Sequence, residues 1–257
     1  MTAIAGQIVC VTGASSGIGA ACASAFAREG CHLLLVARRK DRIDALAARL
    51  SGQHAIECTT AQADVRRQEE VERTFSGLPD RWRHIDILIN NAGLARGLSR
   101  LHEGSLDDWE EMIDTNIKGL LYVTRSVLPS MVERKRGHVI NIGSIAGHQV
   151  YPAGNVYCAT KFAVNALTQG LKQDLLGTGV RVCSVSPGLV QTEFSEVRFR
   201  GDEERARQVY ARTRPLRPED VAEVAVFCAT RPAHVDISEV IVMPTDQASV
   251  HHVHRTP

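Results

Sequence analysis

The sequence lacks the features that would place the protein in a membrane, in the secretory pathway or on nucleic acid. No stretch approaches the roughly 18 consecutive apolar residues that a membrane span needs. The first residues have neither the charged start nor the long apolar run of a signal peptide. Lysine and arginine total 30 against 29 for aspartate and glutamate, so no net charge attracts nucleic acid or anionic lipid. We therefore expect a cytoplasmic protein without membrane or nucleic-acid partners.

The seven cysteines also lack a metal-binding or redox pattern. They are scattered along the chain with no Cys-x-x-Cys pair, so neither a zinc site nor a redox motif is indicated. We interpret them as buried free thiols in a reducing compartment. The tail carries His251, His252 and His254, which we expect to be solvated or to contact another subunit. No metal site is expected.

Apolar, β-branched runs alternate with amphipathic segments along the whole chain. This alternation predicts right-handed β-α-β crossovers and one α/β domain over residues 1–257: a Rossmann-like, doubly wound parallel sheet of about seven strands flanked by helices. The predicted strands are Gln7–Thr12, His32–Ala37, His54–Cys58, Ile85–Asn90, His138–Gly143, Val180–Ser186 and Glu239–Met243. The predicted helices are Gly17–Glu29, Arg39–Leu50, Gln68–Ser76, Asp107–Arg134, Asn155–Leu176 and Pro218–Thr230.

Residues 188–217 break the alternation. They carry no strand signal and include the charged stretch Arg198–Arg207. Because a connection this long is uncommon inside a compact domain unless it has a function, we predict that it forms a lid or a substrate loop.

Glycines at the end of the first predicted strand indicate a phosphate site. Gly13, Gly17 and Gly19 lie between this strand and a helix that follows at once. Glycine tolerates positive φ and lets the backbone approach a ligand, and the helix N-terminus offers free N–H groups to a pyrophosphate. The spacing departs from Gly-x-Gly-x-x-Gly, and an ordinary glycine turn is the alternative.

The end of the second predicted strand favours NADP(H) over NAD(H). An NAD enzyme places an acidic residue there for the ribose 2′-hydroxyl, whereas an NADP enzyme uses arginine near the 2′-phosphate. This sequence has Arg38 and Arg39, and no acid before Asp41. Two guanidinium groups suit a phosphate dianion, although they could also be the solvated basic start of a helix.

Tyr157 and Lys161 are four residues apart in a predicted helix, so they share one face. A free tyrosine has a pKa near ~10. A neighbouring ammonium and an oxidised nicotinamide would lower that pKa and allow proton transfer. Taken alone, the pair is common and usually structural.

Several motifs in order give this pair its context. The chain contains Gly13-x-x-x-Gly17-x-Gly19, Asn90-Asn91-Ala92-Gly93, Asn116, Ser144, Tyr157-x-x-x-Lys161 and Pro187-Gly188. Together they resemble the short-chain dehydrogenase/reductase family over essentially the whole chain. Stretches such as Gly154–Tyr157, Thr192–Phe199 and Pro232–Val235 are closer still to the NADP-dependent 3-hydroxy acid (serine/allo-threonine) dehydrogenases and the sulfoacetaldehyde reductases.

The resemblance implies catalytic roles at the matching positions. Tyr157 would act as acid or base on the substrate oxygen, and Ser144 would hydrogen-bond that oxygen. Lys161 would lower the Tyr157 pKa and hold the nicotinamide ribose. Asn116 would anchor a water chain from Lys161 to solvent, although asparagine could also cap or kink a helix here.

The implied cofactor contacts run from the glycine loop to the segment after the sixth strand. Asp64 would border the adenine, although it could instead simply end a strand. The resemblance also implies a homotetramer. The predicted cofactor residues are Gly13, Ser15, Ser16, Gly17, Ile18, Gly19, Arg38, Arg39, Asp64, Val65, Asn90, Asn91, Ala92, Gly93, Tyr157, Lys161, Pro187, Gly188, Val190 and Thr192.

A small anionic substrate would need a cationic anchor. We predict Arg198 for this role, with Arg200 second, although loop arginines are commonly just solvated. His148 and Tyr151 follow Ser144 closely and are expected to line the same pocket.

The leading hypothesis is an NADP(H)-dependent oxidoreductase that interconverts a small β-hydroxy acid, such as serine or 3-hydroxypropionate, and its carbonyl form. A sulfoacetaldehyde reductase that forms isethionate is the alternative, followed by a general carbonyl or diol dehydrogenase. A catalytically silent NADPH-sensing regulator is the alternative of another class. It would need only the phosphate site, so Ser144, Tyr157, Lys161 and Asn116 argue against it.

Overall fold

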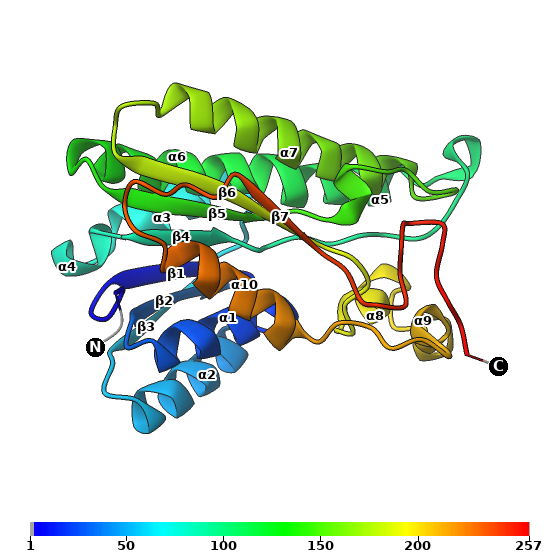
Figure 1. The fold of residues 1–257 in the computed structure, drawn as a ribbon, viewed down its shortest axis with the longest axis horizontal. Helices are drawn as coiled ribbons and strands as arrows, with labels where there is room; N and C mark the ends of the chain where they lie inside the picture. The colour runs from blue at the N-terminus through cyan, green and yellow to red at the C-terminus, as the bar shows by residue number, and fades with distance from the viewer. Residues whose placement is uncertain (1–2, 257) are drawn as a thin grey trace.

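Seven parallel strands form the centre of the structure, a computed structural model that describes residues 3–256 (Figure 1). Their order is β3-β2-β1-β4-β5-β6-β7. The chain builds outward from β1 to β3 and then returns to the other side of β1, which creates a switch point between β1 and β4. The strands are β1 (Ile8–Thr12), β2 (His32–Ala37), β3 (Cys58–Gln62), β4 (Ile87–Asn90), β5 (Gly137–Ile142), β6 (Val180–Pro187) and β7 (Glu239–Val242).

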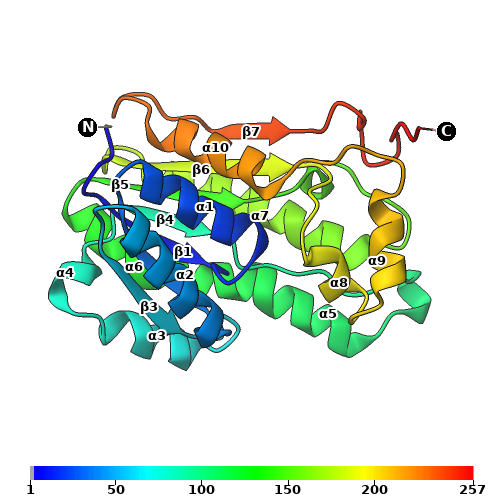
Figure 2. The same cartoon turned by 90° about the horizontal axis from the view of Figure 1, so that it is seen from below.

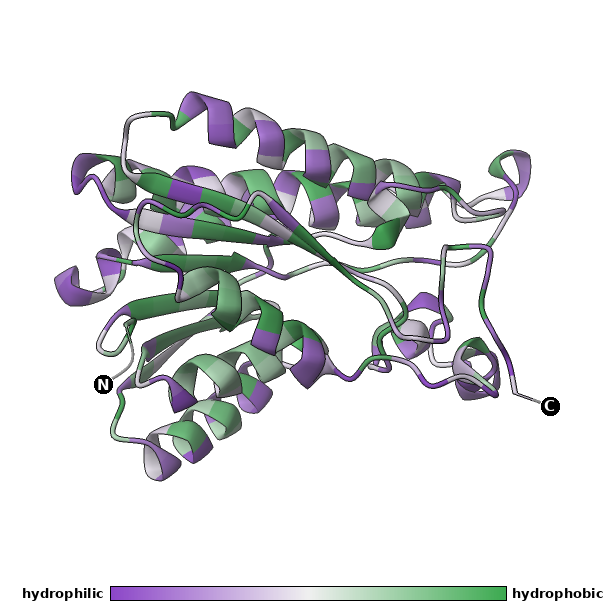
Figure 3. Cartoon of the chain, viewed as in Figure 1, coloured by the Kyte–Doolittle hydropathy of each residue, from purple (hydrophilic) through white to green (hydrophobic). Residues whose placement is uncertain are grey.

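Helices cover both faces of the sheet (Figure 2). The central strands are buried on both sides, so they consist almost wholly of apolar residues. Figure 3 shows these apolar strands between helices that carry polar residues on their outer turns. One face carries α1 (Gly17–Arg28), α2 (Lys40–Gln53) and α10 (Pro218–Ala229), and the other carries α3 (Gln68–Ser76), α6 (Gly119–Glu133) and α7 (Asn155–Asp174).

Shorter helices complete the fold. They are α4 (Asp80–Arg83), α5 (Leu106–Ile113), α8 (Phe194–Arg198) and α9 (Glu203–Tyr210), with the 3-10 turns Leu101–Glu103 and Ile145–Gly147.

The predicted doubly wound α/β fold is confirmed. Within residues 3–256, no helix combines the length and the apolar character needed to cross a membrane.

The third strand lies further along the chain than predicted. The prediction of a strand over His54–Cys58 is wrong, because β3 is Cys58–Gln62 and pairs with β2 from Leu33 onward. β3 is an edge strand whose side chains are only partly buried. Its polar threonines therefore give a weaker apolar signal than the segment before it.

The single helix predicted over Asp107–Arg134 is divided in the structure. α5 ends at Ile113, a π-helical turn spans Asp114–Lys118, and α6 begins at Gly119. Such turns are rare and are frequently found at functional sites. Residues 188–217, which carried no strand signal, contain the two short helices α8 and α9.

His138 is a buried histidine near the N-terminal end of β5, away from the edge of the sheet where the strands end. Neither ring nitrogen has a hydrogen-bond partner within the described residues. Burial, aided by the charges of Arg181 and Lys172, lowers the pKa of His138 from 6.5 to about 3. Since the unfolded chain takes up this proton more readily, stability is complete above about pH 6.5 and is lost as the pH falls towards 3.

We expect the wild-type protein to lose about 2 kcal/mol of unfolding free energy between pH 7 and pH 5 through His138. The variant His138→Leu removes the titrating ring and should lack this share of the loss. Denaturant unfolding at the two pH values measures it. An exposed control, His84→Gln, should keep the wild-type dependence. Equal pH dependence in His138→Leu and the wild type would show that His138 is not the cause.

Candidate active site

The loop between β1 and α1 brings backbone to the switch point of the sheet. Gly13 and Gly17 have φ values of +66° and +52°, a region that glycine adopts without strain. A Cβ on Gly13 would lie 2.9 Å from the Cα of Ala92, and one on Gly19 would lie 2.4 Å from the carbonyl oxygen of Gly13. The loop thus needs glycine at both positions, and it leaves the N-terminus of α1 open to an anionic ligand.

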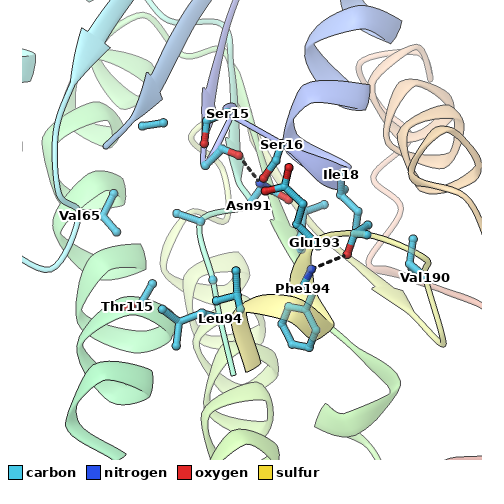
Figure 4. A pocket seen from close by; sticks show the side chains of 18 of the residues that line it. Ser15, Ser16, Ile18, Val65, Asn91, Leu94, Thr115, Val190, Glu193 and Phe194 are labelled. Atoms are coloured by element: carbon cyan, nitrogen blue, oxygen red, sulfur yellow. Dashed lines mark hydrogen bonds between the residues drawn. The ribbon is translucent and has the colours of Figure 1, made fainter. Parts of the chain in front are cut away.

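A cavity of about 330 Å³ lies at the carboxyl ends of the strands, beside this loop (Figure 4). Its wall contains all of the predicted cofactor residues except Gly19 and Asn90. Further residues that the sequence patterns did not assign also line it. These are Ala37, Ala63, Leu94, Thr115, Ile142, Gly143, Glu193, Phe194 and Val197.

Asn90 points into the core and does not line the cavity. Its side-chain amide donates hydrogen bonds to Thr124 and to Asn141, both at 2.9 Å, and the residue is buried. The prediction of a cofactor contact through the Asn90 side chain is therefore not supported. Gly19 acts instead through close packing against the Gly13 carbonyl.

Arg39 extends from the end of β2 across the glycine loop. Its Nε and Nη2 atoms donate to the Ser15 hydroxyl at 3.1 and 3.0 Å, and Nη2 donates to the Ser16 hydroxyl at 2.7 Å. Its Nη1 atom pairs with Glu193 at 2.9 Å. Arg38 also lines the cavity but is more exposed. This cluster of guanidinium and hydroxyl donors suits a phosphate dianion, as the sequence predicted.

Asp64 lies on the same wall beyond β3. Burial raises its pKa, but hydrogen bonds from the guanidinium and backbone of Arg66 outweigh burial and hold the pKa below its usual value. The Arg66 Nε atom lies 2.9 Å from both carboxylate oxygens. Asp64 therefore presents a fixed carboxylate at the cavity edge.

Tyr157, on α7, lines the cavity together with Ser144, Lys161 and Gly188. Burial raises the Tyr157 pKa above its ordinary value, and the neighbouring Tyr151 adds to the rise. The charge of Arg198 and a hydrogen bond with Ser144 oppose it without reversing it. The phenol is thus fully protonated at neutral pH.

Lys161 follows one helical turn after Tyr157 and lines the same cavity. Nζ donates to the carbonyl oxygen of Ile142 at 2.9 Å. Burial lowers the Lys161 pKa from 10.5 to about 8. Arg198 is the cation that lowers the Tyr157 pKa most in this structure. The predicted effect of Lys161, together with an oxidised nicotinamide, on that pKa stays a prediction.

Asn116 lies behind the cavity wall, in the π-helical turn. Its Oδ1 accepts from the backbone N–H of Leu94 at 2.9 Å, and its Nδ2 donates to the Leu94 carbonyl at 2.8 Å and to the Thr160 hydroxyl at 3.0 Å. Asn116 thus joins the segment after β4 to α7 directly beside Lys161. Its predicted part in proton transfer stays a prediction.

Arg198, the last residue of α8, lies against the Tyr157 ring. Its guanidinium carbon is 5.1 Å from the ring centroid of Tyr157 and 5.2 Å from that of Phe194, within the range of cation–π attraction. Nη2 donates to the Tyr151 hydroxyl at 2.7 Å, while the buried Nε has no partner in the described part of the chain. The sequence prediction thus selected a cation that the fold brings to the tyrosine.

Arg96 fixes the helix that carries Arg198. The side chain of Arg96 donates to the Val197 carbonyl and pairs with Glu111 at 2.6 Å, and both side chains are largely buried. The backbone N–H of Gly97 donates to the Arg198 carbonyl at 2.9 Å. The end of α8 is therefore tied to the segment after β4.

Two other predicted substrate residues have different surroundings. Tyr151 lies beside Arg198, as described, whereas His148 points towards β7. The His148 Nε2 atom is 2.8 Å from Glu239 and 3.1 Å from the Asn165 amide. The prediction that His148 lines the substrate pocket is therefore not supported, because this contact holds the ring elsewhere. Arg200 pairs with Asp108 at the surface and is more exposed than Arg198.

Glu193 and Phe194 are the cavity residues that sequence reasoning most clearly missed. Glu193 pairs with Arg39 and Arg42, which lie more than 150 positions earlier in the chain. Phe194 meets Tyr157 edge to face, with ring centroids 5.6 Å apart. Both follow Thr192, which was assigned, but no local pattern identifies partners so distant in the sequence.

Known proteins resemble this chain over nearly its full length. It is 51% identical over 243 residues to the NADP-dependent 3-hydroxy acid dehydrogenase YdfG of Salmonella typhi, covering 94% of this chain and 96% of that protein. It is 46% identical, with the same coverage, to sulfoacetaldehyde reductase 2 of Chromohalobacter salexigens. The solved closed form of serine dehydrogenase complexed with NADP+ has a TM-score of 0.91 at 47% identity, covering 97% of this chain and 100% of that one.

The short chain dehydrogenase family matches residues 7–203, a range that contains the glycine loop, Ser144, Tyr157 and Lys161. The fold, the grouping of these residues on one cavity wall and the similarities of sequence agree with each other. The chain belongs to the short-chain dehydrogenase family.

Proposed function

We propose that this protein is an NADP(H)-dependent oxidoreductase that interconverts a small anionic β-hydroxy acid, such as serine or 3-hydroxypropionate, and its carbonyl form. The position of Arg198 beside Tyr157 carries the proposal. An acid group bound by Arg198 leaves the oxygen on its β-carbon close to the phenol. The relatives named as NADP-dependent 3-hydroxy acid dehydrogenases and the serine dehydrogenase complex support it.

The donors that line the cavity support a dinucleotide with a 2′-phosphate as its ligand. The glycine loop and the start of α1 would hold the pyrophosphate, and Arg39 with Ser15 would hold the 2′-phosphate. Lys161 would bind the nicotinamide ribose at the opposite end. When bound, NADPH supplies the hydride, while the protein orients it towards the substrate.

Tyr157 would exchange the proton. In reduction, the protonated phenol donates to the oxygen of the carbonyl as negative charge develops there, and Ser144 donates a second hydrogen bond to the same oxygen. The raised pKa keeps the phenol protonated before the reaction. In oxidation the steps reverse, and the positive charges of Lys161 and Arg198 stabilise the phenolate.

Arg198 and Tyr151 would bind the acid group of the substrate. The Arg198 Nε is buried without a partner in the described residues, and the Tyr151 hydroxyl is directed to the same guanidinium. These donors serve a carboxylate or a sulfonate. Sulfoacetaldehyde, reduced to isethionate, is therefore the second candidate, which the 46% identical reductase supports.

The remaining proposals concern the surroundings of the site. We propose that residues 188–217, whose helix α8 contributes Phe194 and Val197 to the cavity wall, act as a lid or substrate loop. We propose, from the family resemblance, that copies assemble into a homotetramer, in which exposed apolar side chains on α5, α6 and α7, namely Ile113, Leu121 and Phe162, would be covered. The free cysteines suit a cytoplasmic location.

The choice of substrate can be tested by following NADPH absorbance with malonic semialdehyde, sulfoacetaldehyde and neutral propanal. We expect both anionic aldehydes to exceed propanal in kcat/KM by at least about tenfold, because only they engage Arg198. We expect malonic semialdehyde to be the best of the three. Equal values for all three would contradict the anion anchor, and no turnover with any of them would favour a regulator without activity.

Replacing Arg198 distinguishes its part in binding the acid group of the substrate from the proton transfer by Tyr157. In Arg198→Ala, we expect kcat/KM for malonic semialdehyde to fall by about 50-fold through a higher KM, because a charge-assisted hydrogen bond is lost. The value for propanal should fall by less than about fivefold. Arg200→Ala, two residues away and exposed, should behave like the wild type. Equal losses for the charged and neutral substrates in Arg198→Ala would contradict the assignment.

A further inference from the structure

Arg39, the proposed phosphate-binding arginine, already has an anionic partner, Glu193, at the start of α8. Arg39 Nη1 lies 2.9 Å from one carboxylate oxygen of Glu193, while Nε and Nη2 donate to Ser15 and Ser16. In Figure 4, Glu193 lies beside Ser15 and Ser16 within the same pocket. Arg39 and Glu193 are both partly exposed, with side-chain exposures of 40% and 38%.

The same carboxylate has a second cation to hold it. Arg42 Nη1 donates to both oxygens of Glu193, at 2.7 and 3.0 Å. Burial raises the Glu193 pKa, but hydrogen bonds from Arg39 and Arg42 outweigh burial and keep it below its usual value. Glu193 is therefore a full negative charge at neutral pH, shared between two guanidinium groups.

A phosphate dianion on Arg39 would lie next to this carboxylate. The phosphate and the Glu193 carboxylate would repel each other, because both carry negative charge and both would contact the guanidinium of Arg39. Arg42 can keep Glu193 without help from Arg39, because it already bonds both oxygens. The carboxylate can thus leave Arg39 without losing all of its charged partners.

We propose that Glu193 is a specificity-determining residue that competes with the adenosine 2′-phosphate of the cofactor for Arg39 and passes to Arg42 when the phosphate binds. Glu193 then weakens the binding of phosphate-bearing nucleotides and leaves those without the phosphate unaffected. It also precedes the first turn of α8, the helix that carries Arg198. Its change of partner therefore takes place at the end of the helix that presents the substrate anchor.

The inference rests on the proposed role of Arg39, and a binding assay tests the two separately. The probes are adenosine 2′,5′-bisphosphate and 5′-AMP, which differ only in the phosphate, titrated calorimetrically at fixed ionic strength. Arg39→Gln should weaken binding of the bisphosphate and leave 5′-AMP within about twofold. If it does not, the phosphate lies elsewhere and the proposed cofactor role of Arg39 is wrong.

Glu193→Gln keeps the size of the side chain and removes its charge. We expect it to tighten binding of the bisphosphate by about fivefold and to leave 5′-AMP within about twofold. The exposed neighbour Glu196 provides the matched control, and Glu196→Gln should match the wild type. Unchanged or weaker bisphosphate binding in Glu193→Gln, with Arg39→Gln weakened, would overturn the inference and leave the role of Arg39 intact.

A double variant tests the transfer to Arg42. Arg42→Gln should weaken bisphosphate binding in the wild-type background, because Glu193 then depends on Arg39 alone. It should have little effect once Glu193 is glutamine. Equal weakening in both backgrounds would place Arg42 on the phosphate itself and contradict the transfer.

Discussion

The burial of one phenol between an arginine and the wall of the cofactor cavity is the constraint on which the site depends. Tyr157 lies in a position where burial keeps its proton in place, and Arg198 is the cation that most opposes this effect. The guanidinium of Arg198 lies over the face of the Tyr157 ring. Its Nη2 atom also donates a hydrogen bond to the Tyr151 hydroxyl. One guanidinium thus lowers the pKa of the Tyr157 phenol and holds the Tyr151 hydroxyl, and we propose that it also binds an anionic substrate.

The fold holds these two groups together from separate parts of the chain. Tyr157 is carried by a long helix packed on the sheet, whereas Arg198 ends a short helix in the connection after β6. That short helix is fixed at one end by Arg96 and Gly97, and Glu193 at its other end pairs with Arg39 and Arg42. Contacts to Arg39 and Arg42 on one side and to the segment after β4 on the other therefore meet on one short helix.

Most of the framework could be predicted from the sequence because it depends on local patterns. The apolar strands, the amphipathic helices and the glycine loop each have a short-range physical signature, and the one strand that was misplaced, β3, is a partly exposed edge strand. The positions of Tyr157 and Lys161 on one helical face likewise follow from their spacing. The directions of side chains do not follow from spacing. The Lys161 ammonium donates to the carbonyl of Ile142, and the His148 ring contacts Glu239. Contacts such as Arg39–Glu193 arise only from the tertiary fold.

Removing the phenol tests the account most directly. In Tyr157→Phe the ring remains but the proton does not, so kcat for NADPH-dependent reduction of malonic semialdehyde should fall by at least about 100-fold. Binding of NADPH, followed by its fluorescence, should stay within a few-fold of the wild type. Loss of turnover with intact cofactor binding is the predicted result. Turnover close to that of the wild type would contradict the central role given to Tyr157.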